Sequence, residues 1–281
     1  MKMFEDVLVP VDGSEDGWRA LQQAVWVTGE NATLHGLYVV DVRLVEGPLA
    51  YTIAYGGVIP YTEPVEMDVS LEMADLLEKQ GKKVLEEFAR RCKESGRKCT
   101  TELRRGIISK EICEAAESRD LIVMGKRGEG APWASFLLGS TYEAVVRAAK
   151  VPVLGVAGEA RKIRKMLAAY DGSPRARDAI KYAAWLMESG DRELVVLVIG
   201  KPQRGEALLE EARQALKGVQ GVRFVRRTGH AAETILSVAE SEEVDLLLIG
   251  GYSRSRFISF LFGSTVEQVV RKAEMPVLVC R

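Results

Sequence analysis

Short apolar runs alternate with longer amphipathic segments along the whole chain. Runs such as VLVPV (7–11), LIVMG (121–125) and LLLIG (246–250) are continuous, which is typical of strands that helices cover on both faces. Strands that alternate with helices predict βαβ units, a parallel sheet and right-handed crossovers. The fold class expected is therefore α/β with a doubly wound sheet, although the pattern leaves the strand order open.

In the first half of the chain the pattern predicts five strands separated by four helices. The strands are expected near Val7–Val11, Thr33–Val40, Lys98–Arg104, Leu121–Met124 and Val151–Val156. The helices are expected near Glu15–Val27, Leu71–Glu94, Ser109–Glu117 and Thr141–Ala149.

The second half repeats the first. Residues 7–27 match residues 166–186, and residues 120–156 match residues 245–280. The repeat predicts two domains, 1–158 and 162–281, each long enough to bury a core of its own. The first copy is longer in its middle, around residues 43–69, and this Gly-, Pro- and Tyr-rich stretch predicts a long loop or lid.

Composition narrows the class of protein without changing this picture. The chain is 47% hydrophobic and 28% charged with a net charge of −1, which gives no electrostatic reason to expect nucleic acid or a membrane surface as a partner. No apolar run is long enough to span a bilayer, and the acidic residues near the start predict no signal peptide, so we expect a cytoplasmic protein. The four cysteines form no Cys-x-x-Cys pair, which favours reduced, mostly buried thiols over a metal site.

Candidate chemistry lies where strands end. Asp12-Gly13-Ser14 and Asp171-Gly172-Ser173 each follow a strand, and either a simple turn with a helix N-cap or a ligand contact explains them. Further along, a strand ends in glycines in both copies and Gly-Ser-Thr then opens a helix, at 139–141 and 263–265. Such a turn offers unpaired N–H groups and a positive helix end to an anion such as phosphate. Four nearby basic residues either add charge at this turn or, as is more usual for exposed loop residues, are simply solvated: Lys126, Arg127, Arg254 and Arg256.

These motifs together resemble the universal stress protein family. The likeness rests on VPVDGS, on a G-x-x-G-x(n)-G-S pattern after an apolar strand, and on VPVL at the last strand, and it covers nearly the whole chain as a tandem member. The resemblance implies two Rossmann-like domains of the adenine nucleotide alpha hydrolase type, each a five-stranded parallel sheet between helices. It also implies ATP or AMP as the ligand, with or without Mg²⁺.

The resemblance carries nucleotide-binding roles to positions in both copies. In the first copy these are Pro10, Val11, Asp12, Val40, Met124, Gly125, Gly128, Gly139, Ser140 and Thr141. In the second they are Tyr170, Asp171, Ile249, Gly250, Ser253, Gly263, Ser264 and Thr265. The last strands resemble the family's dimerising edges, which predicts pairing of the two copies within one chain and leaves a further homodimer open.

Each copy departs once from the family's glycine spacing. The first has ten residues between Gly128 and Gly139 where the pattern has nine, and the second has Ser253 in place of a glycine. The second copy keeps the spacing and lacks the long loop, so it is favoured as the better-retained site.

The expected function is that of a non-enzymatic, nucleotide-dependent regulator in the stress response. One alternative is an interaction scaffold whose sites no longer bind nucleotide. The other is a slow ATPase or an adenylyl-transferring enzyme, although His35 and His230 have no evident catalytic partner in the sequence.

Overall fold

The computed structural model describes residues 4–43, 67–127, 139–188, 190–251 and 265–281. The strands are β1 (Asp6–Pro10), β2 (Thr33–Asp41), β3 (Lys98–Gly106), β4 (Leu121–Gly125), β5 (Val153–Val156), β6 (Lys165–Ala169), β7 (Glu193–Ile199), β8 (Val222–Arg227), β9 (Leu246–Gly250) and β10 (Val277–Cys280). The helices are α1 (Glu15–Val27), α4 (Met67–Glu94), α5 (Ile108–Ala115), α6 (Ser140–Ala148), α7 (Pro174–Met187), α8 (Pro202–Ala215), α9 (Ala231–Ser241) and α10 (Thr265–Lys272), with a 3₁₀ turn at Ala116–Ser118.

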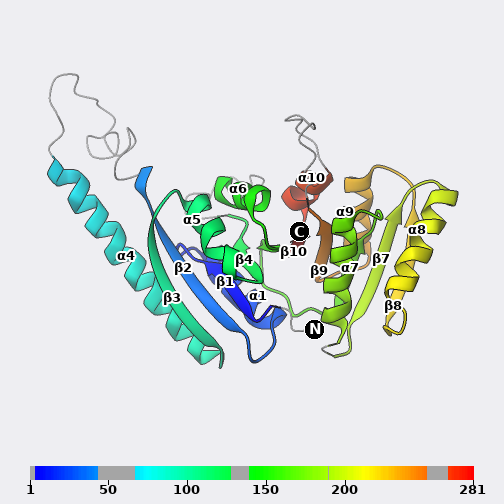
Figure 1. Cartoon of the computed structure of the whole chain (residues 1–281), viewed down its shortest axis with the longest axis horizontal. Helices are drawn as coiled ribbons and strands as arrows, with labels where there is room; N and C mark the ends of the chain where they lie inside the picture. Colours follow the sequence, from blue (N-terminus) through cyan, green and yellow to red (C-terminus); the bar gives the residue numbers. More distant parts are fainter. Residues whose placement is uncertain (1–3, 44–66, 128–138, 189, 252–264) are drawn as a thin grey trace, which may run out of the picture.

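The strands form one ten-stranded sheet in the order β3-β2-β1-β4-β5-β10-β9-β6-β7-β8. Within each half all neighbouring strands are parallel. The halves meet where β5 and β10 pair antiparallel, so the expected pairing of the last strands is present. Figure 1 shows this junction in the middle of the molecule, with α4 and α8 at its two outer ends.

Both faces of the sheet are covered, which explains the continuous apolar runs. Strand residues alternate between two cores: Val7 and Val9 face the core under α1, α4, α7 and α8, whereas Leu8 faces the core under α5, α6, α9 and α10. Each core contains residues of both halves, so burial continues across the β5–β10 junction. The α/β fold with two tandem copies is as the sequence predicted.

The repeat extends to individual hydrogen bonds. Asp120 Oδ2 accepts from the N–H groups of Glu5 and Asp6, each at 3.0 Å. In the second half Asp245 Oδ2 accepts from Arg164 and Lys165 in the same way, at 2.9 and 3.0 Å. One carboxylate in each half therefore holds the backbone at the start of its first strand.

Several element boundaries differ from the sequence prediction, most of them by one or two residues. Helix α4 starts at Met67 rather than Leu71, so the last residues of the expected 43–69 loop are helical, and residues 44–66 lie outside the described residues. Helix α5 ends at Ala115 and continues as the 3₁₀ turn. Strand β5 starts at Val153 because Pro152 has no N–H to donate to a neighbouring strand.

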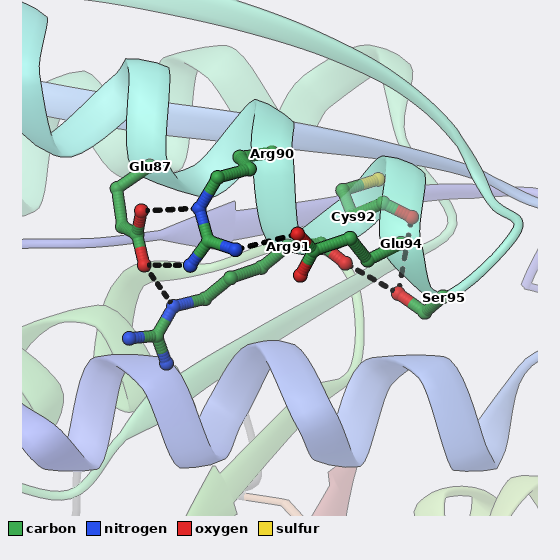
Figure 2. Close-up of polar contacts among 6 residues, drawn as sticks. All are labelled: Glu87, Arg90, Arg91, Cys92, Glu94 and Ser95. Carbon is green, nitrogen blue, oxygen red and sulfur yellow. Dashed lines mark hydrogen bonds and ion pairs between the residues drawn. The ribbon is translucent and has the colours of Figure 1, made fainter.

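The outer helix α4 carries an ion-pair network near its C-terminal end (Figure 2). Glu87 accepts from both Arg90 and Arg91 at 2.6 Å, and Arg90 also pairs with Glu94 at 2.5 Å. Hydrogen bonds from Arg90 and Arg91 lower the pKa of Glu87 to about 2. Arg91 lies 4.5 Å from the centre of the Trp18 ring on α1, so the network also joins α4 to its neighbouring helix.

A buried glutamine fixes the segment that links the two copies. Gln23 on α1 is fully buried; its amide nitrogen donates to the Arg161 carbonyl at 3.0 Å and its amide oxygen accepts from the Arg161 N–H at 2.8 Å. Both backbone groups of one linker residue are thus satisfied by one side chain of the first half.

Gln23→Ala is expected to lower the free energy of unfolding by about 1–2 kcal/mol, because it leaves two linker backbone groups without their partner. Urea denaturation of the full chain measures this, and the exposed neighbour Gln22→Ala serves as the control. Equal stability of the two variants would show that the linker contact contributes nothing.

None of the helices in the described part of the chain combines the length and the apolar character needed to cross a membrane.

Candidate functional site

The two Asp-Gly-Ser turns have the same geometry in both halves. Asp12 Oδ1 accepts from the Ser14 N–H at 3.0 Å and from its hydroxyl at 2.6 Å, and Asp171 Oδ1 accepts from the Ser173 N–H at 2.9 Å. The glycine between them has a positive φ in each copy, +92° and +79°, a conformation that glycine adopts without steric cost.

Each serine caps the following helix. Ser14 accepts from Gly17 at the start of α1, and Ser173 accepts from Ala176 at the start of α7, both at 3.2 Å. The turn-and-cap interpretation of this motif therefore holds, and it places the two aspartates at the carboxyl edge of the sheet.

A cavity of about 480 Å³ opens at that edge in the second half. Five residues expected to bind nucleotide line it: Tyr170, Asp171, Ile249, Gly250 and Thr265. They come from the ends of β6 and β9 and from the start of α10, so the fold brings together segments nearly a hundred residues apart. The other three expected residues of this copy, Ser253, Gly263 and Ser264, lie outside the described residues.

Most of the cavity wall is apolar. Apolar residues of β7, α9 and α10 form much of it: Leu197, Ile199, Ala231, Ile235, Val266 and Val269. Polar side chains come mainly from the β6–α7 turn and the first turns of α7: Asp171, Ser173, Arg175 and Asp178. An apolar pocket of this size with a few polar groups at one side is typical of a small-molecule site.

Glycine at the ends of β4 and β9 is required by the protein's own packing. A Cβ on Gly250 would lie 3.0 Å from the Ala176 nitrogen, and one on Gly125 would lie 2.9 Å from the Asp16 backbone. Because glycine has no side chain, the first turn of α7 can approach the end of β9, and the first turn of α1 can approach the end of β4.

The first half places its expected residues at the equivalent edge. Pro10, Val11 and Asp12 follow one another at the end of β1, Val40 lies near the end of β2, and Met124 and Gly125 end β4. Gly139, Ser140 and Thr141 open α6, and Gly128 lies outside the described residues.

One donor expected for phosphate is already used in the first half. The Gly139 N–H donates to the Lys126 carbonyl at 2.8 Å, and a Cβ on Gly139 would lie 3.0 Å from the same oxygen. Glycine is therefore needed here for a close backbone contact within the protein, and this N–H already has an acceptor.

Lys126, one of the four basic residues that could add charge at this turn, is instead buried against the other half. Its side chain is only 3% exposed, and its Nζ donates to the carbonyls of Ala273 at 2.9 Å and Met275 at 3.5 Å in the other half. Both carbonyls follow the last turn of α10, where a cation is favourable. Burial, helped by the charge of Arg127, lowers the pKa of Lys126 to about 7.

Tyr170 connects the cavity to the outer helix. Its hydroxyl donates to Glu211 on α8 at 2.7 Å, and Arg177 donates to the same carboxylate oxygen at 2.7 Å. Burial, together with the hydrogen bond to Glu211, raises the pKa of Tyr170 to about 12, so the phenol stays protonated at neutral pH.

The sequence prediction missed Arg175 and the apolar residues that β7, α9 and α10 contribute to the cavity. The sequence contains a signal for them. The apolar residues lie at the end of β7, the strand beside β6, and in the first turns of α9 and α10, and Arg175 lies two residues after the capping Ser173. In the part of the chain that the structure describes, no three His, Cys, Asp or Glu side chains gather in a way that suits a metal ion.

Comparison with known proteins agrees with the fold and the repeat. The profile of the universal stress protein family matches residues 3–157 and again residues 162–281. The universal stress protein Slr1230 of Synechocystis is 27% identical over 99% of this chain and all of its own length, and one from Mycolicibacterium smegmatis is 26% identical over 98% of this chain and 96% of its own. The crystal structure of a universal stress protein from Archaeoglobus fulgidus superposes with a TM-score of 0.79 at 23% identity, covering 99% of this chain and 97% of that one. This chain belongs to the universal stress protein family and contains two tandem copies of its domain.

Proposed function

We propose that the chain binds an adenine nucleotide, ATP or AMP, in the cavity of its second half. Bound nucleotide then regulates the chain's interactions in the stress response without being turned over. The observation that carries the proposal is the position of the cavity. It lies at the carboxyl ends of β6 and β9, and the strand order β8-β7-β6-β9-β10 reverses its direction of winding between these two strands. Ligands of open α/β sheets bind at such a point.

The cavity has an apolar side that suits the base of a nucleotide and a second side, at the start of α10, that suits its phosphates. Leu197, Ile199 and Ile235 offer apolar surface to a planar base. Gly250, Gly251 and Thr265 line the other side, where the positive end of the α10 helix dipole favours an anion.

Binding without turnover is supported by the carboxylates that line the cavity. Asp171 accepts from the Ser173 N–H, and Asp178 accepts from Lys181 Nζ at 2.9 Å. Both are held in local contacts of their own helix or turn. Their positions suit a structural role rather than that of a general base on a ligand.

Ala231→Trp tests the proposal by filling the cavity from the first turn of α9. We expect it to weaken ATP and AMP binding to the second half by more than about tenfold, a loss of about 1.4 kcal/mol. Isothermal titration of the full chain measures the affinity, with and without Mg²⁺.

Ser237→Trp is the matched control, since Ser237 is exposed on the same helix and does not line the cavity. Its affinity for nucleotide should equal that of the wild type. Wild-type protein that binds neither ATP nor AMP would contradict the proposal, and so would equal affinities of the two tryptophan variants.

A further inference from the structure

The first helix of each copy begins with a pair of opposite charges, and the order of the pair is inverted between the copies. The repeat sets Asp16 of α1 opposite Arg175 of α7, and Arg19 opposite Asp178. In the first half Asp16 and Arg19 form an ion pair of 2.9 Å. The same two positions of the second half therefore carry the opposite charges.

The two inverted residues occupy the same place in the fold. A Cβ built on Gly125 would lie 2.9 Å from the Cβ of Asp16, and one built on Gly250 would lie 3.0 Å from the Cβ of Arg175. Asp16 thus lies beside the glycine that ends β4, and Arg175 lies beside the glycine that ends β9, where the cavity of the second half opens. The charge of Asp16 or Arg175 would therefore act on the part of a ligand that lies against the end of β4 or β9.

In the second half the charge at this position is positive. Arg175 lines the cavity, and within the described residues it has no carboxylate partner. Asp178 also lines the cavity, but Lys181 on the next turn pairs with it at 2.9 Å. The start of α7 therefore presents an excess of positive charge.

In the first half the corresponding charge is negative. Arg19 pairs with Asp16 and also with Glu15 at 2.8 Å, so one cation is shared by two carboxylates. Asp16 Oδ2 is buried and accepts no hydrogen bond from the described part of the chain. The charge of Lys126 also acts on Asp16, but its Nζ donates to carbonyls of the other half and is not directed to a ligand at the end of β4.

We propose that Arg175 is a specificity-determining residue that makes the second half favour the more highly phosphorylated nucleotide, and that Asp16 makes the first half disfavour it. The inference rests on the proposed nucleotide binding and adds an order of affinities for nucleotides with different numbers of phosphates. The affinity of the second half rises from adenosine to AMP to ATP, whereas the first half gains little from added phosphates unless a divalent cation offsets Asp16.

Titration of the full chain with adenosine, AMP and ATP, in EDTA and in Mg²⁺, tests this proposal. Arg175→Ala is expected to weaken ATP binding by about tenfold and to leave adenosine binding within about twofold, because a charge-assisted contact acts only on the phosphate end. Arg213→Ala on α8 removes the same charge from an exposed position outside the cavity and should change neither affinity.

The first half is tested in the Ala231→Trp background, where the cavity of the second half is filled. Asp16→Asn is expected to tighten the remaining ATP binding in EDTA by about three- to tenfold without changing adenosine binding. Wild-type protein that binds none of the three ligands would overturn the proposed function itself. Nucleotide binding in which Arg175→Ala weakens adenosine and ATP equally, or in which Asp16→Asn leaves ATP binding unchanged, would overturn the charge selectivity alone.

Discussion

Gly155→Val is expected to lower the free energy of unfolding by about 3 kcal/mol, because strand β5 has no room for a side chain at this position. A Cβ on Gly155 would lie 2.0 Å from the hydroxyl oxygen of Tyr142 and 2.4 Å from the ring carbon that carries it. Tyr142 is only 1% exposed, so its ring cannot move aside without disturbing the core under α6. Urea denaturation of the full chain measures the loss.

The second half shows how the same place is filled without a clash. In the repeat, Val266 is equivalent to Tyr142 and Val279 is equivalent to Gly155. The second half thus has two valines where the first half has a large residue and a glycine. The double variant Tyr142→Val/Gly155→Val should therefore recover most of the stability that Gly155→Val loses. A double-mutant cycle measures the coupling between the two sites, and additive losses would contradict this packing argument.

Lys126→Met is expected to flatten the dependence of stability on pH above neutrality. Burial lowers the pKa of Lys126 from 10.5 to about 7, with Arg127 acting in the same direction and Asp16 against it. Between these two pH values the unfolded chain binds a proton that the folded chain does not. The wild type therefore gains stability from this group as the pH rises, on the order of 3 to 5 kcal/mol over the whole interval.

Unfolding free energies from urea titrations between pH 7 and pH 9.5 give the slope. We expect the wild type to gain about 1 kcal/mol per pH unit more than Lys126→Met, since methionine fills the same volume without a titrating group. Lys181→Met, at an exposed lysine of α7, should keep the wild-type slope. Parallel curves for the wild type and Lys126→Met would show that Lys126 titrates as a solvated lysine does.

The order of the elements could be predicted from the sequence because each signal for them is local. Continuous apolar runs identified the buried strands, and the serines after Asp12 and Asp171 marked the starts of α1 and α7. Boundaries moved where a local detail decided them, as at Pro152. The strand order and the antiparallel contact of β5 with β10 depend on pairing between distant segments, which the pattern does not specify.

For the candidate site, the sequence could place residues at the strand ends, but it could not place side chains that reach across the fold. Lys126 follows a strand and precedes a glycine-rich stretch, so its sequence context resembles that of a phosphate ligand. Its actual partners, the carbonyls of Ala273 and Met275, are far away in the sequence and become visible only when the halves are joined. The apolar wall of the cavity was missed for the same reason, because its residues look like ordinary core positions of α9 and α10.

The single lysine at the junction shows what covalent duplication permits. When two identical subunits associate about a two-fold axis, every interface residue occurs twice, and a buried cation on one side imposes the same cation on the other. Here the position equivalent to Lys126 is Gly251, whose Cβ would lie 2.6 Å from the Cys280 carbonyl and which leaves no room for a second side chain. When one chain contains both copies, this symmetry no longer applies. A residue such as Lys126 can then occur in one half only, with its partners in the other half.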